Sequence, residues 1–256
     1  MRRGRQFELT SLAERLAPLA SDAMDAAAGL LGAENSFDPS DSTKRFTISL
    51  SEYAMTVLAE PLSRAFQDRA PGCSIAFDAI PTDSRRIERQ LMRRDLLVGT
   101  TGFGLPGIVE PLFRDRIVCI VDERNPVGAS GTLTLEQLRS LPRAVAEIGP
   151  RDRTRRRFED AEAQTALAEG RVRIVVSSLL TLPFVISGTD MCGFVPARLA
   201  ASCPEALRLR RVQSPLPERD IVEAMHWHPT RAHDASAKWL RALLHEIADQ
   251  LGVVAT

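Results

Sequence analysis

Several features that would assign a function quickly are missing from this 256-residue chain. Its 33 Lys and Arg residues balance 33 Asp and Glu residues, so net charge gives no case for binding nucleic acid or a membrane surface. We find no long uncharged apolar run and expect no membrane-spanning helix. The basic N-terminus carries Glu8, Glu14 and Arg15 where a signal peptide has its apolar core, so we expect a cytoplasmic protein without a signal peptide.

The marks of catalysis and of metal binding are also scarce. The four cysteines, Cys73, Cys119, Cys192 and Cys203, are scattered without a CxxC pair, and we expect them to be small buried residues in a reducing compartment. The sequence contains no GxSxG, P-loop or HExxH motif and no carboxylate pair suited to acid–base work. We therefore predict that the chain is not an enzyme and has no cofactor.

Two weaker patterns have alternative interpretations. His226 and His228 alternate along a predicted strand and suggest a metal pair, but no Cys or carboxylate is spaced to complete a metal site, which favours structural or pocket-lining histidines. The segment from Gly102 to Gly107 (GFGLPG) matches the GxGxxG pattern of dinucleotide-binding loops. Pro106 and Pro111 oppose the helix start that such a loop requires, so we predict a surface loop there.

The chain does contain a clear strand that turns into a helix. Phe46 to Leu50 alternate apolar and polar residues, which is the period of a strand with one buried face. After Ser51, apolar residues recur from Ala54 to Phe66 at helical spacing. We therefore predict that Ser51 stands at a helix N-terminus, where free N–H groups and the helix dipole favour an anion.

The segments that follow alternate between strand and helix patterns, which implies a parallel α/β sheet. In residues 151–157, five arginines suggest either a nucleic-acid-binding arm or, as we favour, the solvated first turn of a helix. The predicted strands lie at 73–80, 96–99, 116–121, 144–148, 171–176, 191–195 and 221–228, and the predicted helices at 85–94, 133–141, 197–201 and 235–251, with a helical run after Ser177 and Ser178.

Near the N-terminus, apolar residues recur at steps of three and four, which are the a and d positions of a helix that pairs with another helix. Thr10 is placed to cap this helix. Pro18 lies inside the helix but off the apolar seam, and we expect it to kink the helix there. A terminal helix docked on its own domain is the alternative. The residues that we predict to form the dimer contact in this helix are Leu9, Leu12, Leu16, Leu19 and Leu30.

These patterns resemble the effector-binding domain of LysR-type transcriptional regulators, in the branch of nodulation and aromatic-catabolism regulators. Ser177 to Ala200 (SSLLTLPFVISGTDMCGFVPARLA) is the most specific part, and Trp227 to Pro229 resembles the C-terminal signature of the branch. Arg5 to Thr10 resemble the last wing strand and linker-helix start of the family's winged helix-turn-helix, most of which is missing here. DNA would then be contacted only through that missing domain or a full-length partner.

The resemblance implies an α/β, two-lobed fold of the type II periplasmic-binding-protein kind, preceded by a long linker helix. Residues 1–33 would be the wing remnant and dimerisation helix. Residues 44–256 would be the effector-binding domain, with lobe I at 44–122 and 221–256 and lobe II at 123–220. Because lobes of this family also pair head to tail in dimers or tetramers, we predict Leu58 and Leu62 to contact a partner.

Hydroxyl side chains at predicted strand ends indicate where an effector binds, because ligands of open α/β sheets lie at the carboxyl ends of strands. The resemblance implies a small aromatic or carboxylate-bearing effector between the lobes, with its polar end at the helix start after Ser51. Each hydroxyl has an alternative role as a helix cap. The predicted effector-binding residues are Ser51, Thr82, Thr100, Thr101, Ser178, Phe184 and His226, and the histidine would add positive charge near neutral pH.

The predicted function is therefore the effector-sensing and oligomerisation part of a DNA-binding transcription regulator. A solute-binding protein of a transporter is one alternative, since it shares the fold, but it requires a signal peptide and has no use for a heptad helix. A bilobed α/β enzyme is the other, and it requires a catalytic constellation that the sequence does not display.

Overall fold

The computed structural model describes residues 2–3, 6–7, 10, 12–13, 16, 19–20, 23, 37–81, 83–148, 156–157 and 171–252. The chain divides into two compact units, Met1–Asp38 and Pro39–Thr256. The predicted residues Leu9, Leu30 and Thr82 lie outside the described residues. In the part of the chain that is described, no helix is both long and apolar enough to cross a membrane.

The first unit contains a short hairpin and helical residues. β1 (Arg2–Arg3) pairs antiparallel with β2 (Gln6–Phe7). Thr10 Oγ1 accepts a hydrogen bond from the Ala13 amide at 3.2 Å, which confirms the predicted cap. The helical residues carry three leucines whose exposed fractions are large: Leu12 at 57%, Leu16 at 48% and Leu19 at 52%.

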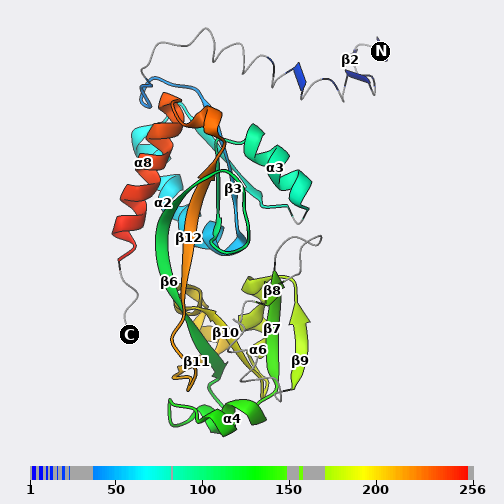
Figure 1. Ribbon diagram of the computed structural model, residues 1–256, viewed down its shortest axis with the longest axis vertical. Coiled ribbons are helices and arrows are strands. Elements are labelled where there is room, and N and C mark those ends of the chain that lie inside the picture. Colours follow the sequence, from blue (N-terminus) through cyan, green and yellow to red (C-terminus); the bar gives the residue numbers. More distant parts are fainter. Residues whose placement is uncertain are drawn as a thin grey trace. The chain divides into compact units, whose positions relative to one another are not determined.

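The second unit is built on one connected sheet with the strand order β4-β3-β5-β12-β6-β10-β7-β8, to which β11 is added beside β6 and β9 beside β7 (Figure 1). The sheet turns from parallel to antiparallel at β12, which runs against β5 and β6. The strands are β3 (Arg45–Leu50), β4 (Ser74–Ala79), β5 (Leu96–Thr100), β6 (Ile108–Asp122), β7 (Arg143–Ile148), β8 (Arg156–Arg157), β9 (Val172–Val176), β10 (Cys192–Pro196), β11 (Leu209–Val212) and β12 (Asp220–Trp227).

Two lobes share the long strand β6, as Figure 1 shows. Residues 108–116 of β6 pair with β12 in lobe I, and residues 117–122 pair with β10 and β11 in lobe II. This arrangement confirms the predicted two-lobed fold, while the predicted lobe boundaries stay a prediction. The helices are α2 (Glu52–Arg69), α3 (Ser84–Arg93) and α8 (Ala235–Gln250) on lobe I and α4 (Leu135–Ser140), α6 (Leu182–Ile186) and α7 (Ala197–Ser202) after the chain enters lobe II, with 3-10 turns η1 (Pro126–Gly128), η2 (Leu179–Thr181), η3 (Glu205–Leu207) and η4 (Pro229–Arg231).

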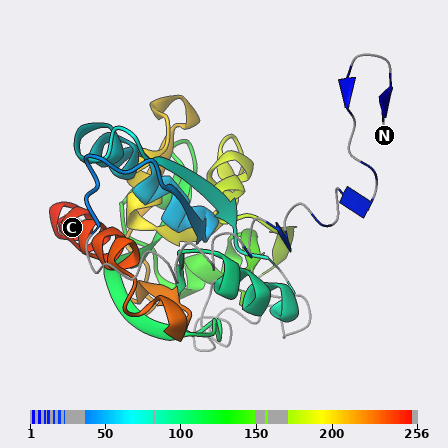
Figure 2. The same ribbon diagram turned by 90° about the horizontal axis from the view of Figure 1, so that it is seen from above.

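Lobe I has helices on both faces of its sheet. Phe46 of β3 is fully buried, and its ring lies 5.4 Å from that of Phe66 on α2 and 5.5 Å from that of Trp239 on α8. On the other face, Ser49 accepts a hydrogen bond from Gln90 of α3 at 2.5 Å. In both views α3 lies on the opposite side of lobe I from α8 (Figures 1 and 2). The predicted strand is thus confirmed, but the prediction of one buried face is wrong, because Ser49 on the other face is also completely buried.

The burial of α2 corrects the predicted lobe contacts. Leu58 and Leu62 have exposed fractions of 0%, so both side chains belong to the core of their own lobe. A partner chain cannot reach them, and the dimer contact predicted for them is wrong. Helical spacing reported a buried stripe correctly, but it did not distinguish burial against the chain's own sheet from burial against a second copy.

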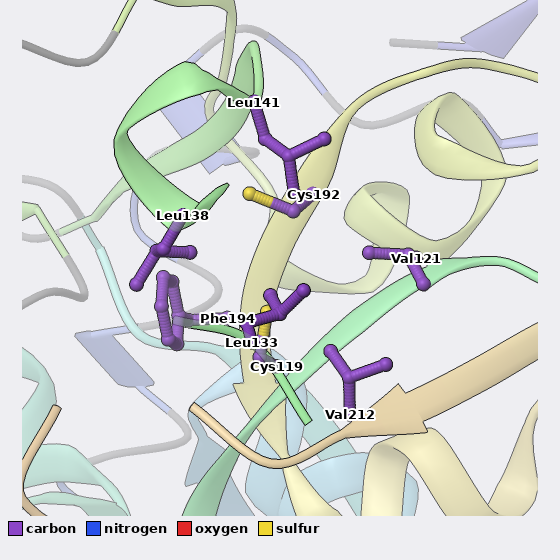
Figure 3. Close-up of a cluster of buried hydrophobic side chains, with 8 residues drawn as sticks. All are labelled: Cys119, Val121, Leu133, Leu138, Leu141, Cys192, Phe194 and Val212. Atoms are coloured by element: carbon purple, nitrogen blue, oxygen red, sulfur yellow. The ribbon is translucent and has the colours of Figure 1, made fainter. Parts of the chain in front are cut away.

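Lobe II is organised around a separate apolar cluster, drawn in Figure 3. Cys119 and Cys192 lie within it and are almost completely buried, which confirms that they act as small apolar residues. Cys73 and Cys203 are only half-buried, and all four thiols are free. The cluster consists of Cys119, Val121, Leu133, Leu138, Leu141, Cys192, Phe194 and Val212.

Strand β6 begins eight residues earlier than predicted, because Pro111 is accommodated inside it. Ala224 of β12 lies opposite Pro111 while Glu223 lies opposite Phe113, so Leu112 is an extra residue and forms a β-bulge. Bulges tolerate a proline that a regular ladder would not. The sequence-based prediction treated this proline as evidence for a loop.

The arginine-rich segment also differs from its prediction. Arg156 and Arg157 form β8, which pairs antiparallel with Ile148 and Glu147 of β7, so these two arginines are not in the first turn of a helix. The remaining arginines of residues 151–157 lie outside the described residues.

Candidate functional site

A pocket of about 270 Å³ lies at the carboxyl ends of strands from both lobes. Its volume is near the lower end of the roughly 300–1,000 Å³ that ligand pockets occupy. Lobe I contributes the ends of β3, β4 and β5 with the loop before β6, and lobe II contributes the ends of β7 and β9. The lining residues are Leu50, Ser51, Glu52, Tyr53, Ala79, Ile80, Pro81, Ile87, Gly99, Thr100, Phe103, Leu105, Glu147, Ile148, Ser177 and Leu179.

Ser51 holds the turn from β3 into α2 at this pocket. Its Oγ accepts a hydrogen bond from the Ala54 amide at 3.0 Å, which confirms the predicted helix cap. The same hydroxyl donates a hydrogen bond to Glu223, with 3.2 Å between Ser51 Oγ and Glu223 Oε2. A single side chain therefore caps the helix and bonds to a buried carboxylate that is not itself part of the pocket lining.

Glu223 is the residue that sequence reasoning missed. It lies on β12 with an exposed fraction of 0%, and it accepts hydrogen bonds from Ser51 and, at 2.5 Å, from Thr100. Burial raises the pKa of its carboxyl to about 7, although both hydroxyl hydrogen bonds act to lower it. The bulge at Leu112 lies beside it in the ladder. One acidic residue inside the apolar strand IVEAM was the available signal.

A second buried acid connects the pocket to the strand that the lobes share. Tyr53, in the pocket wall, donates a hydrogen bond to Asp115 of β6. The same carboxylate accepts a hydrogen bond from the backbone N–H of Arg198, at the start of α7, at 3.0 Å. Burial, with the Asp115 hydrogen bond as a second cause, raises the pKa of Tyr53 far above its usual value. Tyr53 therefore stays a neutral donor that ties α2 to β6.

The predicted site residues separate into two groups. Ser51 and Thr100 line the pocket, whereas Thr101 and Phe184 are exposed outside its lining, Phe184 with an exposed fraction of 60%. Of the two adjacent serines in lobe II, Ser177 lines the pocket and the predicted Ser178 does not. The site assignment as a whole stays a prediction.

His226 lies in the interior, away from the pocket lining. Its exposed fraction is 3%, and its Nδ1 lies 3.2 Å from the Pro106 carbonyl oxygen. Burial lowers the pKa of His226, so the ring is neutral near pH 7 and donates to that carbonyl. The predicted positive charge at this residue is wrong, because a strand position does not reveal how completely a side chain is enclosed.

The two strand-to-helix turns are not equivalent. Ser178 makes no side-chain cap hydrogen bond, and the residues after it form the 3-10 turn η2 before the five-residue α6. Pro183 lies in the first turn of α6, where its missing N–H does no harm. Only the lobe I turn therefore presents a long helix N-terminus to the pocket.

The segment matching GxGxxG is a loop, as predicted, because β6 and not a helix follows it. Gly107 has φ of +100° and lies where a Cβ would come within 2.7 Å of the Trp227 carbonyl oxygen, so glycine is required by local packing. Phe103 and Leu105 from this loop form part of the pocket wall. Among the described residues, no group of three His, Cys, Asp or Glu side chains is placed to hold a metal ion.

Comparison with known proteins agrees with this architecture. The LysR substrate binding domain family matches residues 40–249. Nodulation protein D 2 from Rhizobium tropici is 32% identical over 247 residues, covering 94% of this chain and 76% of that protein. Nodulation protein D 3 from Rhizobium leguminosarum bv. phaseoli is 30% identical over 256 residues, covering 97% of this chain and 82% of that protein.

Solved structures show the same fold at lower identity. The regulatory domain of MexT, a transcriptional activator in Pseudomonas aeruginosa, has a TM-score of 0.65 at 23% identity and covers 80% of this chain and 98% of its own. The Synechocystis PCC6803 CcmR regulatory domain in complex with 2-PG has a TM-score of 0.65 at 13% identity, covering 81% and 99%. The chain belongs to the LysR family of transcriptional regulators, and most of it is the family's substrate-binding domain.

Proposed function

We propose that the pocket between the lobes binds a small effector with an apolar body, and that this binding is the sensing step of a cytoplasmic transcription regulator. The observation that carries the proposal is a pocket whose wall comes from both lobes. A ligand there contacts each lobe, so its binding energy acts on their relative arrangement. The CcmR regulatory domain, solved in complex with 2-PG, supports a ligand-binding role for this fold.

The lining supports an aromatic ligand with one polar end. Side chains such as Ile80, Phe103, Leu105 and Ile148 provide apolar walls from both lobes. Ser51 and Thr100, whose hydroxyls both bond to Glu223, form what we call the base of the pocket, and the other polar lining residues are Glu52, Glu147 and Ser177. An aromatic ring against the walls with a polar substituent at the base satisfies both kinds of surface.

Adjacent serines allow a matched test of this pocket. A compound at about a hundred times its dissociation constant stabilises the fold by roughly 2.7 kcal/mol, which a thermal shift with benzoates, salicylates and flavonoids detects. Ser177→Phe fills the pocket and should abolish the shift caused by any hit. Ser178→Phe, one residue away and outside the lining, should retain the shift. Equal shifts in both variants would place the ligand elsewhere.

We also propose that the chain forms homo-oligomers through the leucines of the first unit. Leu12, Leu16 and Leu19 follow the predicted seam and expose about half of their area or more. Sedimentation at tens of micromolar should show a dimer or larger species. Leu16→Glu should shift it toward monomer, whereas Leu16→Met keeps an apolar side chain with good helix propensity and should not. A monomeric parent protein would contradict the proposal.

A further inference from the structure

We propose that Glu223 determines which ligands the pocket accepts, by fixing the hydrogen-bond polarity of the two hydroxyls at its base. While Glu223 is ionised, both hydroxyls donate their hydrogen bonds to it. The base of the pocket can then only accept hydrogen bonds, so it binds a neutral ligand with an O–H or N–H donor. A ligand carboxylate binds there only together with a proton. This inference rests on the proposed function of the pocket.

The hydrogen bonds that Ser51 and Thr100 make with Glu223 determine whether their hydroxyls can donate to a ligand or only accept from it. An ionised carboxylate only accepts hydrogen bonds, and each hydroxyl has one proton to donate. Ser51 and Thr100 both donate to Glu223, at 3.2 and 2.5 Å. Ser51 Oγ also accepts a hydrogen bond from the Ala54 amide. What the two hydroxyls offer a ligand is therefore lone pairs, which match a donor and repel the oxygens of a carboxylate.

Within the part of the chain that the structure describes, Glu223 forms no ion pair. On the sheet it lies opposite Thr100 of β5 and Phe113 of β6, neither of which is charged. On α2 the titratable residues at the pocket are Glu52 and Tyr53, and the Tyr53 hydroxyl donates a hydrogen bond to Asp115. Glu52 and Glu147, which line the same pocket, add negative charge. The N-terminal dipole of α2, equivalent to about half a positive charge, opposes these groups only in part.

A proton on Glu223 reverses the arrangement. The protonated carboxyl donates to one hydroxyl, and that hydroxyl is then free to donate to a ligand. Because burial places the pKa of Glu223 at about 7, both forms are populated near neutral pH. The pocket would therefore favour donor-bearing neutral ligands at higher pH and admit carboxylates at lower pH.

Benzyl alcohol and benzoate test this, because they share an aromatic body and differ in the polarity of one substituent. Their dissociation constants are measured by ligand-observed NMR titration of the full chain at pH 8.5 and 6.5. Benzoate should bind about 25-fold more tightly to the parent at pH 6.5, as one proton taken up against a pKa of about 7 requires. Benzyl alcohol should change by at most about fourfold and in the opposite direction, because it prefers the ionised form of Glu223.

Two variants separate hydrogen-bond polarity from bulk charge. Glu223→Gln supplies an amide donor at all pH values, so benzoate should bind equally well at both pH values. Glu147→Gln removes one negative charge from the pocket lining and should keep the 25-fold pH dependence of the parent. Thr100→Val, which removes one of the two hydroxyls, should weaken benzyl alcohol binding about fivefold at pH 8.5.

The outcomes distinguish the role of Glu223 from the proposed function of the pocket. A benzoate affinity that is the same at both pH values in the parent would overturn the role of Glu223, and so would a pH dependence that persists in Glu223→Gln. The proposed function would survive either outcome, since ligands still bind. If neither compound binds the parent or Glu223→Gln, the proposed pocket function and the inference that rests on it both fail.

Discussion

Phe46→Ala should lower the free energy of unfolding by about 3–5 kcal/mol, the range for removing a buried aromatic side chain. Phe46 has an exposed fraction of 0% and lies between Phe66 of α2 and Trp239 of α8. Its loss leaves a cavity where both helices meet the sheet, and it removes aromatic contacts worth about 0.5–1.5 kcal/mol each beyond their area. Urea denaturation followed by circular dichroism measures the change.

Phe184→Ala is the matched control for this prediction. Phe184 has an exposed fraction of 60%, so the same substitution there should change stability by about 0.5 kcal/mol or less. Equal effects of the two substitutions would mean that the three-ring cluster does not hold lobe I together.

Stability should fall by about 3 kcal/mol as the pH rises from 4.5 to 8, because of Glu223 alone. Burial raises the pKa of this carboxyl from 4.5 to about 7 in the folded protein. Between these values the folded state keeps a proton that the unfolded state has lost. The stabilisation is therefore complete below about pH 4.5 and is lost as the pH passes through 7.

The comparison with Glu223→Gln isolates this effect, because the amide does not titrate. The unfolding free energy of the parent minus that of the variant should decrease with pH over this range. His226, whose pKa burial lowers, contributes to both proteins and cancels. Asp122, whose pKa hydrogen bonds from Arg124 and Gly188 lower, titrates below the range. A pH-independent difference would show that Glu223 is ionised throughout.

Local sequence patterns predicted the parts of the fold that local physics decides. The strand at β3, the helix start after Ser51 and the cap at Thr10 each depend on a few neighbouring residues, and the structure has all three. The family resemblance added the two-lobed arrangement, which periodicity alone does not imply. Ser51 and Thr100 both line the pocket, because strand ends of a parallel sheet meet at one edge, while their role in binding stays a prediction.

What the sequence did not reveal depends on contacts between distant segments. Glu223 meets Ser51 and Thr100 across 172 and 123 residues of chain, so no local spacing announces it. Ser177 and Ser178 are adjacent at the end of β9, and the sequence does not indicate which of them faces the pocket. In the structure Ser177 lines it. Leu58 and Leu62 show that an apolar stripe identifies a buried face without identifying what covers it.

The continuous strand β6 also has a mechanical consequence for how the lobes can move. β6 and its antiparallel neighbour β12 form a ribbon that is already extended, so it cannot lengthen along its axis. The sheet continues from lobe I into lobe II through β6, so a rotation of one lobe against the other has to twist this strand. The crossing lies between Arg116, the last residue of β6 opposite β12, and Ile117, the first residue opposite β10, so the bulge at Leu112 stays within lobe I.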